Sequence, residues 1–182
     1  MIHVPMGREV HSSYTPLTMP KALRIVVADG DSEALTLYTS LLPALGHTIA
    51  ASVSNGNELV QHCRKLHPDL VITDINMSGK DGLQAAEEIS KERPTPVIVV
   101  SGCRGPEFLQ RAGAEWIIAY LMKPVTEADL DPAITVALYR FGDIQNLRQA
   151  LNDRKMIGRA KSIIMKMTGI DEEEAFRRMQ RV

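Results

Sequence analysis

Cysteine, aromatic residues and long apolar runs are all scarce in this chain of 182 residues, and each scarcity excludes a class of protein. Only Cys63 and Cys103 occur, in unrelated segments, so we expect no disulfide framework and a reducing compartment. No apolar run approaches the roughly 20 residues that span a bilayer, and the first residues lack the apolar core of a secretion signal. We therefore expect a cytoplasmic protein that makes no contact with a membrane.

Charge of one sign is also lacking overall, because the formal net charge is −1. It is unevenly distributed, however. Residues 143–182 carry nine Lys or Arg and six Asp or Glu, a balance of +3, whereas the rest of the chain has a balance of −4. An acidic front and a basic tail indicate that the two parts have different partners.

Short aliphatic runs alternate with segments of helical spacing from residue 21 onward, after a leader (1–20) that lacks periodicity and that we expect to be flexible. The runs predict strands at 23–28, 48–53, 70–73, 97–100 and 116–121. The segments between them predict helices at 32–45, 57–66, 82–92 and 106–114, the first kinked or ended by Pro43. This alternation predicts an α/β fold, a doubly wound five-stranded parallel sheet.

A fifth helix is predicted to begin at Thr126, with a capping signal from Asp129, and to continue without an evident stop to residue 167. Thr168-Gly169 is a helix stop, and Asp171 begins a last short helix that should turn three apolar side chains inward: Ala175, Phe176 and Met179. Within the long helix, an apolar stripe extends beyond the edge of the α/β domain and predicts a homodimer: Phe141, Ile144, Leu147 and Leu151.

Five polar residues follow the predicted strands at their carboxyl ends, where functional groups of an open parallel sheet collect. Asp29 and Asp31 follow the first strand, Asp74 the third, Ser101 the fourth and Lys123 the fifth. A single polar residue at such a place is usually a loop hydrogen-bonder. All five together indicate a functional site.

The stretches IVVADGD, PDLVITDINMSGKDG, PVIVVSG and YLMKPV resemble, in order, the motifs of two-component receiver domains over residues 21–142. The resemblance implies a flavodoxin-like receiver fold and a response regulator that is not an enzyme in the usual sense. It implies that Asp74 accepts a phosphoryl group from a sensor histidine kinase. Ser101 would then hydrogen-bond the phosphoryl group, Lys123 would pair with its charge, and Tyr120 would be the aromatic switch residue.

The resemblance also implies a Mg²⁺ site, and here the sequence departs from the family. Receivers usually carry two adjacent acids after the first strand, whereas this chain has Asp29-Gly30. The metal ligands implied are Asp29, Asp74, the backbone carbonyl of Asn76, and Asp31 if the flexibility of Gly30 lets it reach the metal. The alternative is a degenerate site that binds Mg²⁺ poorly and is not phosphorylated.

Residues 143–182, ending in RAKSIIMKMTGIDEEEAFRRMQRV, resemble the ANTAR domain, a helical module that binds hairpin RNA to prevent transcription termination. A third ANTAR helix would begin where this sequence stops, so either the sequence is a truncated form or the module is curtailed. The basic residues implied as RNA contacts are Arg154, Lys155, Arg159, Lys161, Lys166, Arg177 and Arg178.

Two hypotheses follow. The first is a phosphorylated response regulator that controls an RNA-binding antitermination module. The alternative is a receiver-like interaction module that dimerises through the long helix without control by phosphate. DNA binding through a helix-turn-helix is disfavoured, because the junction MTGID lacks a recognition-helix arrangement.

Overall fold

The computed structural model describes residues 22–102 and 116–179, and within them five parallel strands form one sheet in the order β2-β1-β3-β4-β5. The strands are β1 (Arg24–Ala28), β2 (Thr48–Val53), β3 (Leu70–Thr73), β4 (Val97–Ser101) and β5 (Ile117–Met122). Each matches a predicted strand to within one residue at either end, which confirms the α/β prediction. The leader and the helix predicted at 106–114 lie outside the described residues.

Two separate apolar clusters cover the two faces of the sheet, as a parallel sheet requires. Helices α1 (Ser32–Ala44) and α5 (Glu127–Thr168) contribute Tyr38, Leu42, Leu130 and Ile134 to one cluster. Helices α2 (Gly56–Leu66) and α3 (Gly82–Glu92) cover the other face. Strands β3 and β4 are buried along their whole length, which explains why their sequences are aliphatic without alternation.

The first helix ends as its proline predicts. Pro43 lies in the last turn of α1, and the helix stops one residue later at Ala44. Its start is fixed by Asp31, whose Oδ1 accepts a hydrogen bond from the Glu33 amide at 2.9 Å.

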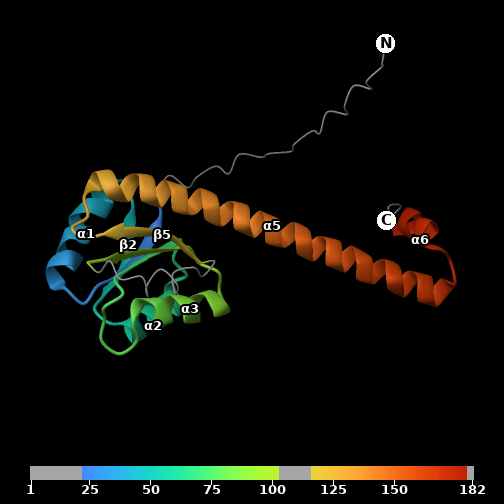
Figure 1. Cartoon of the computed structure of the whole chain (residues 1–182), viewed down its shortest axis with the longest axis horizontal. Helices are drawn as coiled ribbons and strands as arrows, with labels where there is room; N and C mark the ends of the chain where they lie inside the picture. The colour runs from blue at the N-terminus through green and yellow to red at the C-terminus, as the bar shows by residue number, and fades with distance from the viewer. Residues whose placement is uncertain (1–21, 103–115, 180–182) are drawn as a thin grey trace, which may run out of the picture.

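Helix α5 is unbroken over 42 residues, which corresponds to a length of about 63 Å. Both predicted ends are confirmed. The Asp129 carboxylate accepts hydrogen bonds from the amide and hydroxyl of Thr126 at 2.9 and 2.7 Å, and Gly169 takes a left-handed conformation with φ of +69°. Only the first turns are buried, and the rest of the helix projects away from the sheet (Figure 1).

Helix α6 (Glu172–Met179) begins one residue after the predicted start at Asp171, whose carboxylate accepts a hydrogen bond from the Glu174 amide at 2.9 Å. It turns back beside the end of α5 (Figure 1). Ala175 is fully buried there and Met179 is half-buried, but Phe176 remains 45% exposed, so the prediction that all three face inward is wrong for Phe176. Among the described residues, the contact of α6 with α5 does not cover this aromatic ring.

None of the helices in the described ranges is long and apolar enough to cross a membrane.

Candidate functional site

Two buried carboxylates and one ammonium group meet at the carboxyl edge of the sheet. The Lys123 Nζ donates hydrogen bonds to Asp29 Oδ1 at 2.8 Å and to Asp74 Oδ2 at 2.9 Å. Asp29 is fully buried and Asp74 nearly so. Ser101 is the buried last residue of β4, and its carbonyl accepts a hydrogen bond from the Lys123 amide at 3.0 Å. The structure thus brings four of the five predicted polar residues together.

Asp74 is held rigidly from both its backbone and its side chain. Its amide donates to the Ala28 carbonyl at 2.8 Å, and its Oδ1 accepts from the Ile75 amide at 2.6 Å. The start of α3 presses against the same residue, because a Cβ atom at Gly82 would lie 1.9 Å from the Asp74 carbonyl oxygen. The sequence reasoning missed Gly82 as a positioning residue. Its place directly after the Asp81 cap was the available signal.

The charges at this edge perturb the titration of their neighbours. Partial burial lowers the pKa of Lys123, but hydrogen bonds to Asp29 and Asp74, together with their negative charges, raise it more. The net pKa lies above the ordinary value of lysine, so this ammonium stays charged at neutral pH. Burial, reinforced by the charges of the same two aspartates, raises the pKa of Tyr38 on α1.

Asp31 has a different environment from Asp29 and Asp74. Its carboxylate is exposed and caps α1, while its amide donates to Asp29 Oδ1 at 3.0 Å. Within residues 22–102 and 116–179, no group of three or more His, Cys, Asp or Glu side chains is gathered that could hold a metal ion. Two carboxylates, rather than three, converge on Lys123.

The donor set nevertheless fits a divalent cation. Asp29 Oδ2 is buried without a hydrogen-bond partner. It lies 2.7 Å from Lys123 Nζ, but not at an angle suited to a hydrogen bond, so it keeps a lone pair available. A Cβ atom at Gly30 would lie 3.0 Å from the Asn76 carbonyl oxygen, which places that carbonyl beside the loop carrying Asp29. Carboxylate and carbonyl oxygens are the ligands that Mg²⁺ prefers.

Tyr120 lies in β5, where it pairs in register with Val99 of β4. Its side chain is half-buried and packs against the apolar cluster on the α2 and α3 side of the sheet. The ring therefore has one face toward the core and part of its surface toward solvent. Its role as a switch remains a prediction.

The basic residues of the C-terminal region fall into two groups. Arg154, Lys155, Arg159 and Lys166 are exposed on α5. The other three are paired with acids in the first turn of α6: Lys161 with Glu172, Arg177 with Glu173 and Glu174, and Arg178 with Glu174.

The α6 pairs follow from helical spacing and could have been predicted from the sequence. The pair Lys161–Glu172 joins two helices and could not, because it depends on how α6 folds back.

Comparisons with known proteins agree with this geometry. Residues 25–135 match the response regulator receiver domain family, and residues 145–182 match the ANTAR domain family. The chain is 32% identical over 165 residues to the transcriptional regulatory protein PdtaR of Mycobacterium tuberculosis, covering 87% of this chain and 80% of PdtaR.

Solved receiver structures are similar as well. The signal receiver domain of a modulated diguanylate cyclase from Desulfovibrio desulfuricans G20 aligns with a TM-score of 0.63 at 25% identity, covering 66% of this chain and 97% of that one. A CheY-like response regulator receiver domain protein from Methanospirillum hungatei JF-1 aligns with a TM-score of 0.61 at 25% identity, covering 66% and 96%.

Proposed function

The chain belongs to the response regulators, with a receiver domain and an ANTAR RNA-binding output domain, and on that premise we propose that phosphorylation of Asp74 controls binding of an RNA hairpin. A protein with this combination of domains is regulatory rather than enzymatic. The observation that carries the proposal is the pair of hydrogen bonds from Lys123 to Asp29 and Asp74.

The site has the charges that phosphoryl transfer to a carboxylate needs. A carboxylate oxygen of Asp74 bonds to the phosphorus atom of a phosphohistidine on the sensor histidine kinase. The P–N bond then breaks, and its electron pair stays with the imidazole. The reaction brings anions together, and the Lys123 ammonium offsets that repulsion at Asp74 Oδ2. The Ile75 amide fixes the other oxygen, Oδ1.

Mg²⁺ would be held by Asp29, Asp74 and the Asn76 carbonyl, with Asp31 as the further ligand we infer, and it would supply a second positive charge for the phosphoryl oxygens. This chain's own contribution is a preformed pair of buried carboxylates, with Asp29 Oδ2 ion-paired to Lys123 but accepting no hydrogen bond. The Asn76 carbonyl lies beside the loop that carries Asp29 and Gly30.

Phosphate uptake from acetyl phosphate tests the acceptor. Asp74→Asn should abolish incorporation, whereas Asp131→Asn, a matched change at an exposed position of α5, should leave it at the wild-type level. Thermal unfolding of both variants controls for folding. Incorporation into Asp74→Asn at the wild-type level would contradict the assignment.

Mg²⁺ titration distinguishes a functional from a degenerate metal site. If Asp31 acts as a ligand, Asp31→Asn weakens Mg²⁺ binding and Gly30→Asp adds little. If it does not, Gly30→Asp tightens binding by placing a second carboxylate beside Asp29. Failure of the wild type and of both variants to bind Mg²⁺ would favour the receiver-like interaction module.

We propose that Ser101 hydrogen-bonds the phosphoryl group and that Tyr120 turns inward in response. This turn would shift the population of receiver conformations, and α5 would respond to that shift. Both residues are well placed for this. Ser101 is buried at the end of β4, and Tyr120 lies half-buried on the adjacent strand β5.

Contacts with RNA phosphates would come from the basic residues on α5 and α6. Because each neutralised phosphate releases counterion, hairpin binding should weaken steeply as salt rises. Arg159→Ala should lower the affinity for the hairpin. It should also reduce the slope of log affinity against log salt concentration by about one, because one counterion fewer is released. Lys161→Ala should have a smaller effect, because Glu172 already neutralises Lys161. Equal binding by the wild type and an unrelated acidic protein would overturn the RNA proposal.

Dimerisation through α5 is the second function that a specific observation favours. Leu147 and Leu151 are 67% and 58% exposed, which is unusual for two apolar side chains one helical turn apart. Sedimentation of the full chain over a range of concentrations tests this directly.

A further inference from the structure

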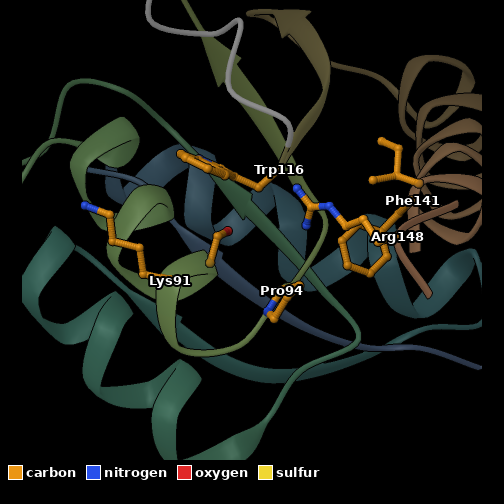
Figure 2. Close-up of a pocket in the computed structure, with 7 residues that line it drawn as sticks. Lys91, Pro94, Trp116, Phe141 and Arg148 are labelled. Atoms are coloured by element: carbon orange, nitrogen blue, oxygen red, sulfur yellow. The ribbon is translucent and has the colours of Figure 1, made fainter. Parts of the chain in front are cut away.

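A small cavity lies at the amino-terminal edge of the sheet, the edge opposite Asp74. We call it the junction cavity, because it lies where α5 leaves the sheet (Figure 2). Its volume is about 130 Å³. The residues that line it come from the end of α3, the loop before β4, the start of β5, and α5: Ser90, Lys91, Pro94, Trp116, Phe141, Ile144 and Arg148.

Hydrogen-bond donors without partners are concentrated here. Among the described residues, four buried side-chain polar atoms lack a hydrogen-bond partner. One is Asp29 Oδ2, and the other three are Ser90 Oγ, Trp116 Nε1 and Gln145 Nε2. Ser90 and Trp116 line the cavity, and Gln145 lies on the same face of α5 as Phe141 and Arg148 by helical spacing.

The chemistry of these three groups is the same. The indole nitrogen and the amide nitrogen can only donate hydrogen bonds, and the hydroxyl group can donate as well. A buried donor without an acceptor destabilises the fold. Two such donors line this cavity, and the third belongs to Gln145, the residue next to the lining residue Ile144, so they indicate a ligand that carries acceptor oxygens.

The charge beside the cavity and the size of the cavity restrict the class of ligand further. The Arg148 guanidinium extends from α5 toward Trp116, whereas the Lys91 side chain points away from Arg148 (Figure 2). A guanidinium suits the oxygens of a carboxylate or a phosphate. At roughly 30 Å³ per water molecule, the cavity has room for about four waters, or for one small anion.

We propose that the junction cavity binds a small oxyanion, a carboxylate or phosphate group, through donors from Ser90, Trp116 and Gln145 and through the charge of Arg148. These residues come from separate elements of the receiver domain and from α5. The bound anion therefore ties the long helix to the sheet at the point where the helix leaves it. The site depends on neither phosphorylation of Asp74 nor RNA binding.

Trp116 provides a direct test, because it is the only tryptophan in the chain. The full-length protein is titrated with inorganic phosphate and, separately, with acetate, at an ionic strength held constant with chloride. At least one anion should change the tryptophan emission saturably, and the two arms distinguish phosphate from carboxylate. Gln145→Leu and Arg148→Gln should each weaken binding by about ten-fold or more.

Two controls separate binding from folding and from the phosphorylation site. Arg140→Gln, at an exposed position of the same helix, and Asp74→Ala should both bind as the wild type does. Gln145→Leu removes a buried unpaired donor, so without added anion its Tm should equal or exceed that of the wild type. Reduced binding by a variant that is no less stable cannot be attributed to unfolding.

Three results would overturn the proposal. The first is a response to both anions no larger than the response to chloride. The second is unchanged affinity in both Gln145→Leu and Arg148→Gln. The third is loss of the response in Asp74→Ala, which would place the anion at the opposite edge of the sheet.

Discussion

The two halves of α5 have the same secondary structure and opposite environments. In the first half, Leu130 and Ile134 are buried against the sheet, and Phe141 and Ile144 pack at the edge of the same cluster. In the second half, Leu151 and Met167 are 58% and 81% exposed, and Leu147 at the midpoint is 67% exposed. The first half is therefore stabilised by packing against the sheet, and the second half by its own backbone hydrogen bonds and by its contact with α6. The described part of the receiver domain packs the first half of α5 against its sheet, whereas the projecting half has apolar and basic surface suited to a partner.

The largest loss of stability is expected for a substitution at Gly82, in the packed receiver part of the molecule. Because a Cβ atom there would lie 1.9 Å from the Asp74 carbonyl oxygen, Gly82→Ala must displace backbone at the start of α3. We expect a loss of about 3 kcal/mol or more in the free energy of unfolding, together with slower phosphate uptake. Urea unfolding measures the first effect. Wild-type stability in this variant would show that the approach of α3 to Asp74 is not tight.

A pair of matched leucine truncations compares the two halves of α5 directly. Leu130→Ala should cost about 2–5 kcal/mol, because Leu130 is fully buried in the receiver core. Leu151→Ala should cost the isolated chain about 0.5 kcal/mol or less, because Leu151 is 58% exposed.

The same two variants test whether the chain dimerises through α5. If α5 pairs with a second copy, Leu151→Ala should weaken the dimer in sedimentation, and its effect on stability should grow with protein concentration. A concentration-independent effect, with no change in sedimentation, would leave the exposed stripe without a role in self-association.

A smaller effect of opposite sign is expected at Gly158, in the projecting half of α5. A Cβ atom there would meet nothing within 4 Å, so Gly158→Ala should stabilise the helix by about 0.8–1 kcal/mol through propensity alone. Slower amide exchange in the surrounding turns would show this gain. Faster exchange would mean that a partner already packs closely against Gly158.

The smallest effect concerns pH at the receiver site. Because the pKa of Lys123 is raised in the folded protein, its contribution to stability is complete below the unfolded lysine value of 10.5. It is lost as the pH rises through the folded value. Lys123→Met should therefore flatten the decline in unfolding free energy at alkaline pH. An unchanged decline would show that the hydrogen bonds of Lys123 to Asp29 and Asp74 do not contribute to stability.

Several site features could be predicted from local patterns. The aliphatic runs indicated the strands, and because parallel strands end at one edge, Asp29, Asp74, Ser101 and Lys123 had to meet there. Gly169 was recognisable as the end of α5, because a left-handed residue at a helix end favours glycine. The exposure of Phe176 was not predictable from α6 alone, since helical spacing indicates a face but not what covers it.

The sequence by itself determined the order of strands and helices and the residues that face the carboxyl edge of the sheet, because hydrophobic periodicity and turn chemistry are local properties. Only the tertiary structure decided that Glu172 neutralises Lys161, and that Ser90 and Trp116, two buried donors without partners, line one cavity beside α5. Each of these depends on which segments distant in the sequence are packed together, and that is fixed by packing across the fold rather than by any one stretch of the chain.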